Sequence, residues 1–572
     1  MYFRSLGCAA ASACLLTCGC QKPNTPGPVN SPANVRPEVQ TAIDEFSVRK
    51  SYDPWVLTSN NPNSPIPAYI SDGHTGYLVG PNGEPTQILQ AGHYVNDHLQ
   101  PLSLPANKAS GQVAQQTLNL QAGIFSTRRV EQSGMAKAAD MPFAPDNFHP
   151  PDWVKYWNTT DVAISGDPEA QQVAHAQLFS LLSSTFPGSS YSIPPMGLSS
   201  TTYQGHIFWD ADIWMFPTLV VQHPDLAASI VEYRSKRLPQ AIANAKEHHF
   251  AGAEFPWESA ETGAETAPAE FAQERHITAD VAFAAWHYYL WTGDEGYLKT
   301  KCWPILKATA QYWTTRATKD GDGSYHVRKV LPPDETAGVV DDDSYTNAMV
   351  RYNLRAAAIA AAKLGQTPDP QWKTIASKLV IPQDKERGIP SEHSVPFKDQ
   401  NKAKQADALL MLWPLEEPYD DATAGKMLDF YAAHTMKSGP AMTAGIHAVV
   451  ASRLGRSDQA LDYYRDSYRP FMRGSWDAFS EKRSTNTVYF LTGMAASLNS
   501  IYYGFAGLQI RLNGEKGTGQ RIAGDGFASL YANPHLPAGW TGLTIKGISF
   551  RGSKVDLTID SAGKVTTVAA KS

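Results

Sequence analysis

The feature that most constrains the fold is a long stretch, from about residue 161 to 512, in which apolar residues recur at spacings of three and four. That spacing predicts amphipathic helices, and Gly or Pro separates one helix from the next, as Pro224 and Gly365 do. The period predicts roughly ten to twelve helices of similar length. Their loops carry Trp, Asp, Glu and His, which favours a toroid of helical hairpins with a functional site among the loops at one end.

Shorter strand-like segments flank the helical stretch. Between residues 46 and 132, Gly and Pro separate brief apolar runs, which is typical of a short N-terminal β domain. Residues 133–160 contain four prolines close together and predict a connector. Residues 513–572 alternate apolar and polar side chains and predict a small C-terminal β-sandwich. The expected fold class is therefore mainly α, with a β domain on each side.

The first residues have the pattern of an export signal. Arg4 precedes an apolar run from Leu6 to Leu16, which is too short to cross a membrane as a helix. Cys20 ends a segment similar to a lipobox, so a signal peptide over 1–20 with lipid attachment at Cys20 is expected, and plain secretion is the second choice. Residues 21–45 show no apolar period and predict a linker. The expected location is a periplasmic or outer-membrane lipoprotein.

Charge and cysteine content exclude several classes of partner. The net charge is −6 and no basic run occurs, which argues against nucleic acid as the partner. Cysteine and histidine show no metal-ligand spacing, so neither a metal nor a cofactor is expected. Aromatic residues make up 10% of the chain, which suits the binding of neutral sugar rings, although large helical cores also use aromatic side chains.

Two glutamates lie in loops that look like parts of a site. Glu335 follows Pro332, Pro333 and Asp334. The prolines restrict the loop, and a like charge at Asp334 would favour the protonated form that a general acid needs. Glu481 lies shortly before the segment 490–493. Cleavage of a glycosidic bond requires two carboxyl groups of this kind, but each glutamate alone could also be an ordinary surface residue.

Four sequence blocks stand out, and a short element follows them. The blocks, in order, are Tyr203 to Asp210, Phe255 to Ala260, Pro333 to Glu335 with Tyr345 to Asn347, and Lys404 to Asp407. The element is Phe490-Leu491-Thr492-Gly493. Together they resemble glycoside hydrolase family 65, and the resemblance is dense over about 155–512. That family contains maltose, trehalose and kojibiose phosphorylases, acid trehalases, kojibiose hydrolases and the glucosidase acting on glucosylgalactosyl hydroxylysine.

The resemblance implies a six-hairpin (α/α) barrel and assigns roles to individual residues. Glu335 matches the family's general acid. Glu481, nine residues before Phe490, matches the general base of the hydrolase branch, where the phosphorylases have a Ser/Thr/Gly loop. The residues implied to hold the sugar are Trp209, Asp210, Lys404 and Gln405, with Trp257 and Glu258 beside them. His276 is expected to converge on the same pocket, although a lone histidine is more often a structural hydrogen-bonder.

The expected activity is inverting hydrolysis of a terminal α-linked glucose from a small neutral α-glucoside. An α-1,2 disaccharide such as kojibiose or glucosyl-galactose is the first choice of substrate, and trehalose is the second. Phosphorolysis by the same scaffold and a sugar-binding lipoprotein without catalysis remain alternatives. Thr336-Ala337 replace the family's usual Tyr-His after the general acid, which leaves the linkage and aglycone open. The sequence does not indicate an oligomeric state.

Overall fold

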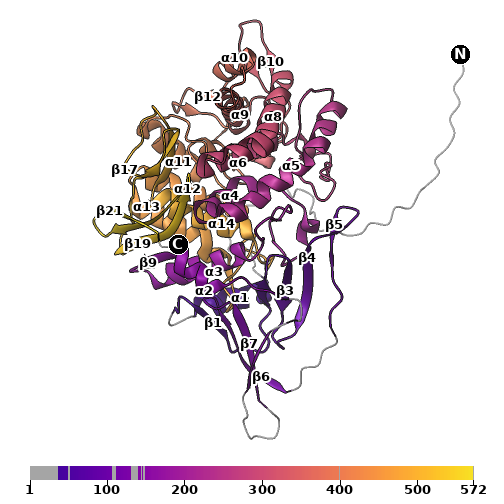
Figure 1. Cartoon of the computed structure of the whole chain (residues 1–572), viewed down its shortest axis with the longest axis vertical. Coiled ribbons are helices and arrows are strands. Elements are labelled where there is room, and N and C mark those ends of the chain that lie inside the picture. Colours follow the sequence, from indigo (N-terminus) through magenta and orange to yellow (C-terminus); the bar gives the residue numbers. More distant parts are fainter. Residues whose placement is uncertain are drawn as a thin grey trace, which may run out of the picture. The chain divides into compact units, whose positions relative to one another are not determined.

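The strands and helices were traced in a computed structural model, which describes residues 36–48, 52–105, 111–130, 139–143, 145, 148–398 and 400–570. The predicted signal peptide and Cys20 lie outside these residues. Residues 36–572 cluster as one unit, drawn in Figure 1 from indigo to yellow. Among the described residues, no helix combines the length and the apolar composition that crossing a membrane requires.

The first helix, α1 (Pro37–Ser47), occupies part of the segment predicted to be a linker. Val39, Ala42 and Phe46 are buried along one face, at the three and four spacing of an amphipathic helix. The helix contacts the short strand β14 (Met472–Arg473), and Gly474 N donates a hydrogen bond to Ala42 O at 2.7 Å. The linker prediction is therefore wrong for this part, because three apolar residues in one short window gave too weak a period.

The N-terminal strands form two antiparallel sheets of four strands each. Buried Leu57, Leu118 and Phe125 pair across β1, β6 and β7 and give the first sheet an apolar face. The first sheet has the order β1 (Val56–Ser59), β6 (Gln112–Asn119), β7 (Ile124–Val130), β8 (Ala139–Pro142). The second has the order β2 (Ala68–Ser71), β3 (Thr75–Val79), β4 (Pro85–Val95), β5 (His98–Pro101).

The helices after α2 (Trp153–Thr159) fall into two alternating sets. The inner set is α4 (Phe216–Gln222), α6 (Ile277–Thr292), α9 (Ser344–Lys363), η6 (Ala408–Met411), α12 (Thr443–Arg453) and α14 (Leu491–Asn499). Each inner helix contacts the next in this order, and α14 contacts α4. The outer set is α3 (Pro168–Leu182), α5 (Pro224–Glu247), α8 (Trp303–Arg316), α10 (Pro370–Lys378), α11 (Asp421–Ala433) and α13 (Ser457–Tyr468). Each outer helix contacts at least one inner helix.

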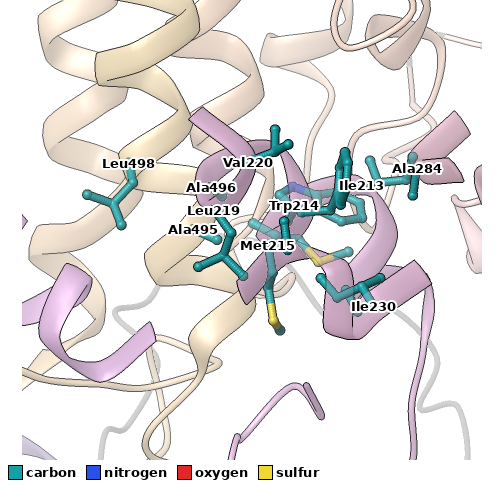
Figure 2. Packing of buried hydrophobic residues seen from close by; sticks show 14 of the residues in the cluster. Ile213, Trp214, Met215, Leu219, Val220, Ile230, Ala284, Ala495, Ala496 and Leu498 are labelled. Carbon is teal, nitrogen blue, oxygen red and sulfur yellow. The ribbon is translucent and has the colours of Figure 1, made fainter. Parts of the chain in front are cut away.

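The core lies where the inner helices meet. Trp214, on the helical turn η2 (Ala211–Met215) that leads into α4, has no exposed surface. Figure 2 shows it near Ala284 of α6, with Ala495 and Ala496 of α14 close to Leu219. Alanines at such contacts allow helix backbones to approach closely, as dense interior packing requires.

The C-terminal strands form a three-stranded and a four-stranded sheet. The first has the order β16 (Leu508–Leu512), β18 (Ala528–Ala532), β17 (Gln520–Gly524). The second has the order β21 (Val565–Ala569), β20 (Ser553–Asp560), β19 (Gly542–Phe550), β9 (Val162–Ser165). Strand β9 precedes the helices in the chain and lies in the same region as the yellow C-terminal strands in Figure 1. The C-terminal sheet is thus completed by residues from the start of the helical region.

Candidate active site

The predicted site residues lie in loops at the N-terminal ends of inner helices. Asp210 immediately precedes η2, and Glu335 lies on the short turn η5 (Glu335–Ala337) before α9. Lys404 and Gln405 precede η6, and Glu481 precedes α14. Loops from four parts of the chain therefore supply the candidate catalytic and sugar-binding groups.

The backbone of Glu481 is fixed on both sides. It follows the hairpin of β14 and β15 (Ala478–Phe479), its N–H donates to Thr487 O at 3.1 Å, and its carbonyl accepts from Ala441 N at 2.9 Å. Its side chain is 8% exposed. The carboxylate is thus held at a defined place while one edge stays open to solvent.

Tyr203 forms a hydrogen bond with one of the candidate carboxyl groups. Its hydroxyl donates to Glu481 Oε1 at 2.8 Å, although its ring is 40% exposed. Burial of the hydroxyl, followed by the charges of Glu481, Asp210 and Glu335, raises the pKa of Tyr203 above its usual value. Tyr203 is therefore the hydrogen-bond partner of Glu481, and the charges of Asp210 and Glu335 act on it more weakly. The sequence analysis missed this role of Tyr203.

The loop of Glu335 is braced by the segment that carries Lys404. Lys404 Nζ donates to Glu335 Oε1 at 2.7 Å, and Lys404 N donates to Asp334 Oδ1 at 2.7 Å. The Asp334 carboxylate also accepts from Thr336 Oγ1 at 2.6 Å, and Gln405 Nε2 donates to Pro333 O at 2.9 Å. The sequence predicted that Asp334 acts on Glu335 as a like charge, but these contacts show a different role for it. Asp334 holds the loop, and the charged group in contact with Glu335 is the Lys404 ammonium.

Asp210 lies beside the segment that follows Glu481. Its carboxylate accepts from Thr492 Oγ1 at 2.6 Å, and its side chain is 7% exposed. Burial raises the pKa of Asp210 to about 6, against the lowering effect of the Thr492 hydrogen bond. The carboxyl group is thus a buried acceptor close to Glu481.

His276 is not available for a direct contact with a sugar. Its side chain has no exposed surface, and its ring nitrogens lie 2.8 Å from Glu274 Oε1 and 2.6 Å from Asp280 Oδ2. Burial alone would lower its pKa, but the carboxylates of Asp280 and Glu274 raise it to about 10. The ring lies 4.5 Å from that of Trp209, which is itself 2% exposed. The prediction that His276 contacts the sugar is therefore wrong. His276 instead packs against Trp209 and is held by two carboxyl groups.

Glu274 connects His276 to the Glu335 loop. Burial raises the pKa of Glu274 to about 8, an effect opposed by His276 and increased by the charge of Glu335. Its Oε2 atom is buried and has no hydrogen-bond partner among the described residues. The sequence analysis did not single out the carboxyl group of Glu274.

We expect the stability of the protein to fall as the pH rises from 6.5 to about 10, and His276→Gln to reduce that dependence. In this window an unfolded histidine has lost its proton, while the folded His276 keeps it until the pH reaches about 10. The slope is at most about 1.4 kcal/mol per pH unit for one proton. Melting temperatures of both proteins from pH 6 to pH 10 would test this, and parallel curves would contradict it.

Trp257 and Glu258 lie in a loop that is linked through His206 to the N-terminal strands. Trp257 is half-buried and stacks on Phe271 with ring centroids 5.0 Å apart. Glu258 Oε1 forms a hydrogen bond with His206 Nδ1, and the other nitrogen of His206 donates to Asp97 O at 2.8 Å. Asp97 lies in the turn between β4 and β5. The second N-terminal sheet thus reaches the block that contains Tyr203.

The same sheet also fixes the turn of Tyr203. Tyr94 of β4 donates its hydroxyl to Gly205 O at 2.6 Å, at the end of η1 (Thr202–Gly205). Tyr203 and Gln204 have φ values of 57° and 56°, which side-chain-bearing residues rarely adopt. An external hydrogen bond therefore helps to maintain a turn that aims the phenol at Glu481. In the described part of the chain, no group of three or more His, Cys, Asp or Glu could hold a metal ion.

Comparisons with known proteins place these residues in a family context. The model of the glycosyl hydrolase family 65 central catalytic domain matches residues 175–403 and 393–499. The kojibiose hydrolase of Mucilaginibacter mallensis is 39% identical over 404 residues, which are 70% of this chain and 57% of that protein. The protein-glucosylgalactosylhydroxylysine glucosidase of Danio rerio is 31% identical over 482 residues, which are 80% of this chain and 70% of that protein.

A solved structure has a similar fold. A putative kojibiose phosphorylase from the human microbiome aligns with a TM-score of 0.69 and 16% identity, covering 91% of this chain and 97% of that one. At this identity the likeness concerns the fold alone. The present chain spans less than two thirds of the length of the kojibiose hydrolase that it matches.

Proposed function

Because the chain belongs to glycosyl hydrolase family 65, we propose that it hydrolyses a terminal α-linked glucose from a small neutral glucoside with inversion. The observation that carries the proposal is the position of Tyr203. Its hydroxyl donates a hydrogen bond to Glu481, and the charges of Asp210 and Glu335 help to raise its pKa. Two of these carboxyl groups suffice for glycoside hydrolysis.

The scaffold of the proposed enzyme is a six-hairpin (α/α) toroid. Two observations support it: the inner helices contact one another in chain order with α14 returning to α4, and a solved structure aligns over 91% of the chain. In such a toroid the loops before the inner helices gather at one end. The carboxyl groups would lie there.

In the proposed reaction Glu335 is the general acid and Glu481 the general base. Glu335 gives its proton to the oxygen of the leaving group, and Glu481 removes a proton from the water that attacks the anomeric carbon from the other face. Lys404, which contacts Glu335, supplies a donor, and the buried Asp210 supplies an acceptor for sugar hydroxyls. The half-buried Trp257 offers an aromatic face to a sugar ring.

Hydrolysis is favoured over phosphorolysis by the position of Glu481. Phosphate needs no deprotonation before it attacks, and a carboxylate would repel it. The Tyr203 hydroxyl holds the Glu481 carboxylate in this position. Phosphorolysis remains the second candidate, because the structural neighbour carries the name of a phosphorylase.

The proposed first substrate is an α-1,2 disaccharide such as kojibiose, followed by trehalose. Two relatives are named for the hydrolysis of kojibiose or of a glucosylgalactosyl group. Export, with lipid attachment at Cys20, is proposed from the sequence. The domain limits proposed there extend from 161 to 512 for the helices and from 513 to 572 for the C-terminal strands.

The proposal is tested with a panel of α-linked glucose disaccharides, assayed for sugar products with and without phosphate. We expect free glucose in equal amounts under both conditions, fastest from an α-1,2 linkage, and a product of inverted configuration. Glucose 1-phosphate formed only with phosphate would establish the second candidate. Binding of the disaccharides without any turnover would indicate a sugar-binding protein.

A further inference from the structure

A second cleft opens at the other ends of the inner helices. It has a volume of about 810 Å³. Its lining includes side chains from the middle and second half of α6, from the middle and second half of α9 and from the end of α12. They are Phe283, Trp286, His287, Leu290 and Trp291, then Tyr352, Arg355, Ala356 and Ile359, then Val450, Arg453 and Leu454. The candidate catalytic groups precede these helices. The cleft is therefore a separate site, of a volume typical of small-molecule pockets.

Aromatic rings form much of its lining. Phe283 and His287 stack with centroids 4.0 Å apart, and His287 stacks on Tyr352 at 5.9 Å. Trp413 and Tyr503 contribute another aromatic pair, with centroids 5.3 Å apart. Flat rings of this kind present apolar faces to a ligand while their edges carry polar atoms.

Two polar side chains in this lining lack protein partners. Within the part of the chain that the structure describes, neither His287 nor the Tyr352 hydroxyl forms a hydrogen bond. Burial lowers the pKa of His287 to about 4, so its ring is neutral at pH 7 and offers one donor and one acceptor. Burial also raises the pKa of Tyr352, so its phenol stays protonated. Both side chains are half-buried in the cleft, so a bound ligand can reach their polar atoms.

The charged residues of the cleft balance one another. Glu416 lies between Arg453, at 2.6 Å, and Arg511. Glu417 lies 3.6 Å from Arg355. With Asp421, Glu515 and Lys516, acidic and basic side chains are equally numerous in the lining. The lining thus suits an uncharged ligand with hydroxyl groups, which His287 and Tyr352 can contact, better than an anion or a cation.

We propose that this cleft is a second binding site for a neutral sugar of one or two rings. The sugar ring lies against the aromatic faces, and its hydroxyl groups exchange hydrogen bonds with His287 and Tyr352. Binding here requires neither Glu335 nor Glu481, so the inference does not rest on the proposed hydrolysis.

The test compares the full chain with the double variant His287→Phe and Tyr352→Phe. Both substitutions keep the stacked rings and remove only polar atoms that bond to no described residue, so the fold is preserved. In calorimetric titration with D-glucose, we expect the wild type to show one more binding event than the double variant. In the double variant the dissociation constant of this additional site should rise roughly tenfold or more, because hydrogen bonds to the ligand are removed. Hydrolysis should stay within about twofold, because no proton-transfer group is changed.

Tyr288→Phe is the matched control. It lies next to His287 on α6 and is not part of the cleft lining, so it should bind D-glucose like the wild type. Crystals soaked with D-glucose should show a sugar against His287 and Tyr352. Identical titrations for the wild type and the double variant would overturn the inference, as would binding of phenol, but not glucose, in the cleft. Loss of all hydrolysis in the wild type would refute the proposed function while leaving this comparison intact.

Discussion

Replacing Glu481 by Gln should lower hydrolysis of an α-glucoside by about 10²–10⁴-fold, the range for removal of a proton-transfer group. The amide has nearly the same shape, so Tyr203 keeps a partner and the loop keeps its backbone bonds to Ala441 and Thr487. The loss should appear in kcat, with KM changed little, because water activation rather than sugar binding is removed. Steady-state kinetics of glucose release would measure both.

Azide distinguishes a missing base from a damaged site. This small nucleophile needs no deprotonation, so it should restore part of the turnover to Glu481→Gln and yield a glucosyl azide. The neighbouring variant Lys482→Gln serves as control, since it removes the charge 3.8 Å from Glu481 without removing the base. Near-normal hydrolysis by Glu481→Gln, together with stimulation of the wild type by phosphate, would make Glu481 a bystander and the protein a phosphorylase.

Replacing Glu335 by Gln should also lower turnover of ordinary α-glucosides by about 10²–10⁴-fold, but its effect should depend on the leaving group. Fluoride departs without a proton, so α-glucosyl fluoride should be hydrolysed by Glu335→Gln far better than a disaccharide. Glu481→Gln should be poor with both substrates. The ratio of kcat/KM for the two substrates, measured in each variant, separates acid from base.

Glu270→Gln is the matched control for this experiment, because Glu270 is an exposed glutamate in the chain segment before His276. It should match the wild type with both substrates. Equal losses on fluoride and disaccharide in Glu335→Gln would contradict its role as the acid. Such a result would mean that the defect comes from Lys404. Its 2.7 Å ionic contact with Glu335 is lost in the variant.

The periodic parts of the fold were predictable, and the exceptions have physical causes. Three-and-four spacing located the helices between residues 161 and 512 because burial of one face is a local property of a helix. Several short elements escaped. Strand β8 and helix α2 lie within residues 133–160, which the sequence predicted to be a connector. Helix α1 buries only Val39, Ala42 and Phe46 among the residues between 37 and 47. Strand β9 is stabilised by pairing with β19, a contact far along the chain.

The site could be predicted only as far as motifs identify residues. Glu481 accepts a hydrogen bond from Tyr203, but no pattern in the sequence indicates that this tyrosine reaches a residue in a distant loop from a turn with positive φ. The error on His276 was avoidable. Asp280 is four residues further along the helix, the spacing at which two side chains meet.

The edge strand β9 has a consequence for how the protein is made. The ribosome releases β9 before helices α3 to α14, whereas its partner β19 emerges after all of them. Until then, the exposed edge of β9 is a target for pairing with other chains, and contacts between such distant segments form slowly. Nascent chains halted before residue 542 would therefore carry an open strand edge. A strand made after all the helices from α3 to α14 thus protects the edge of a strand made before them.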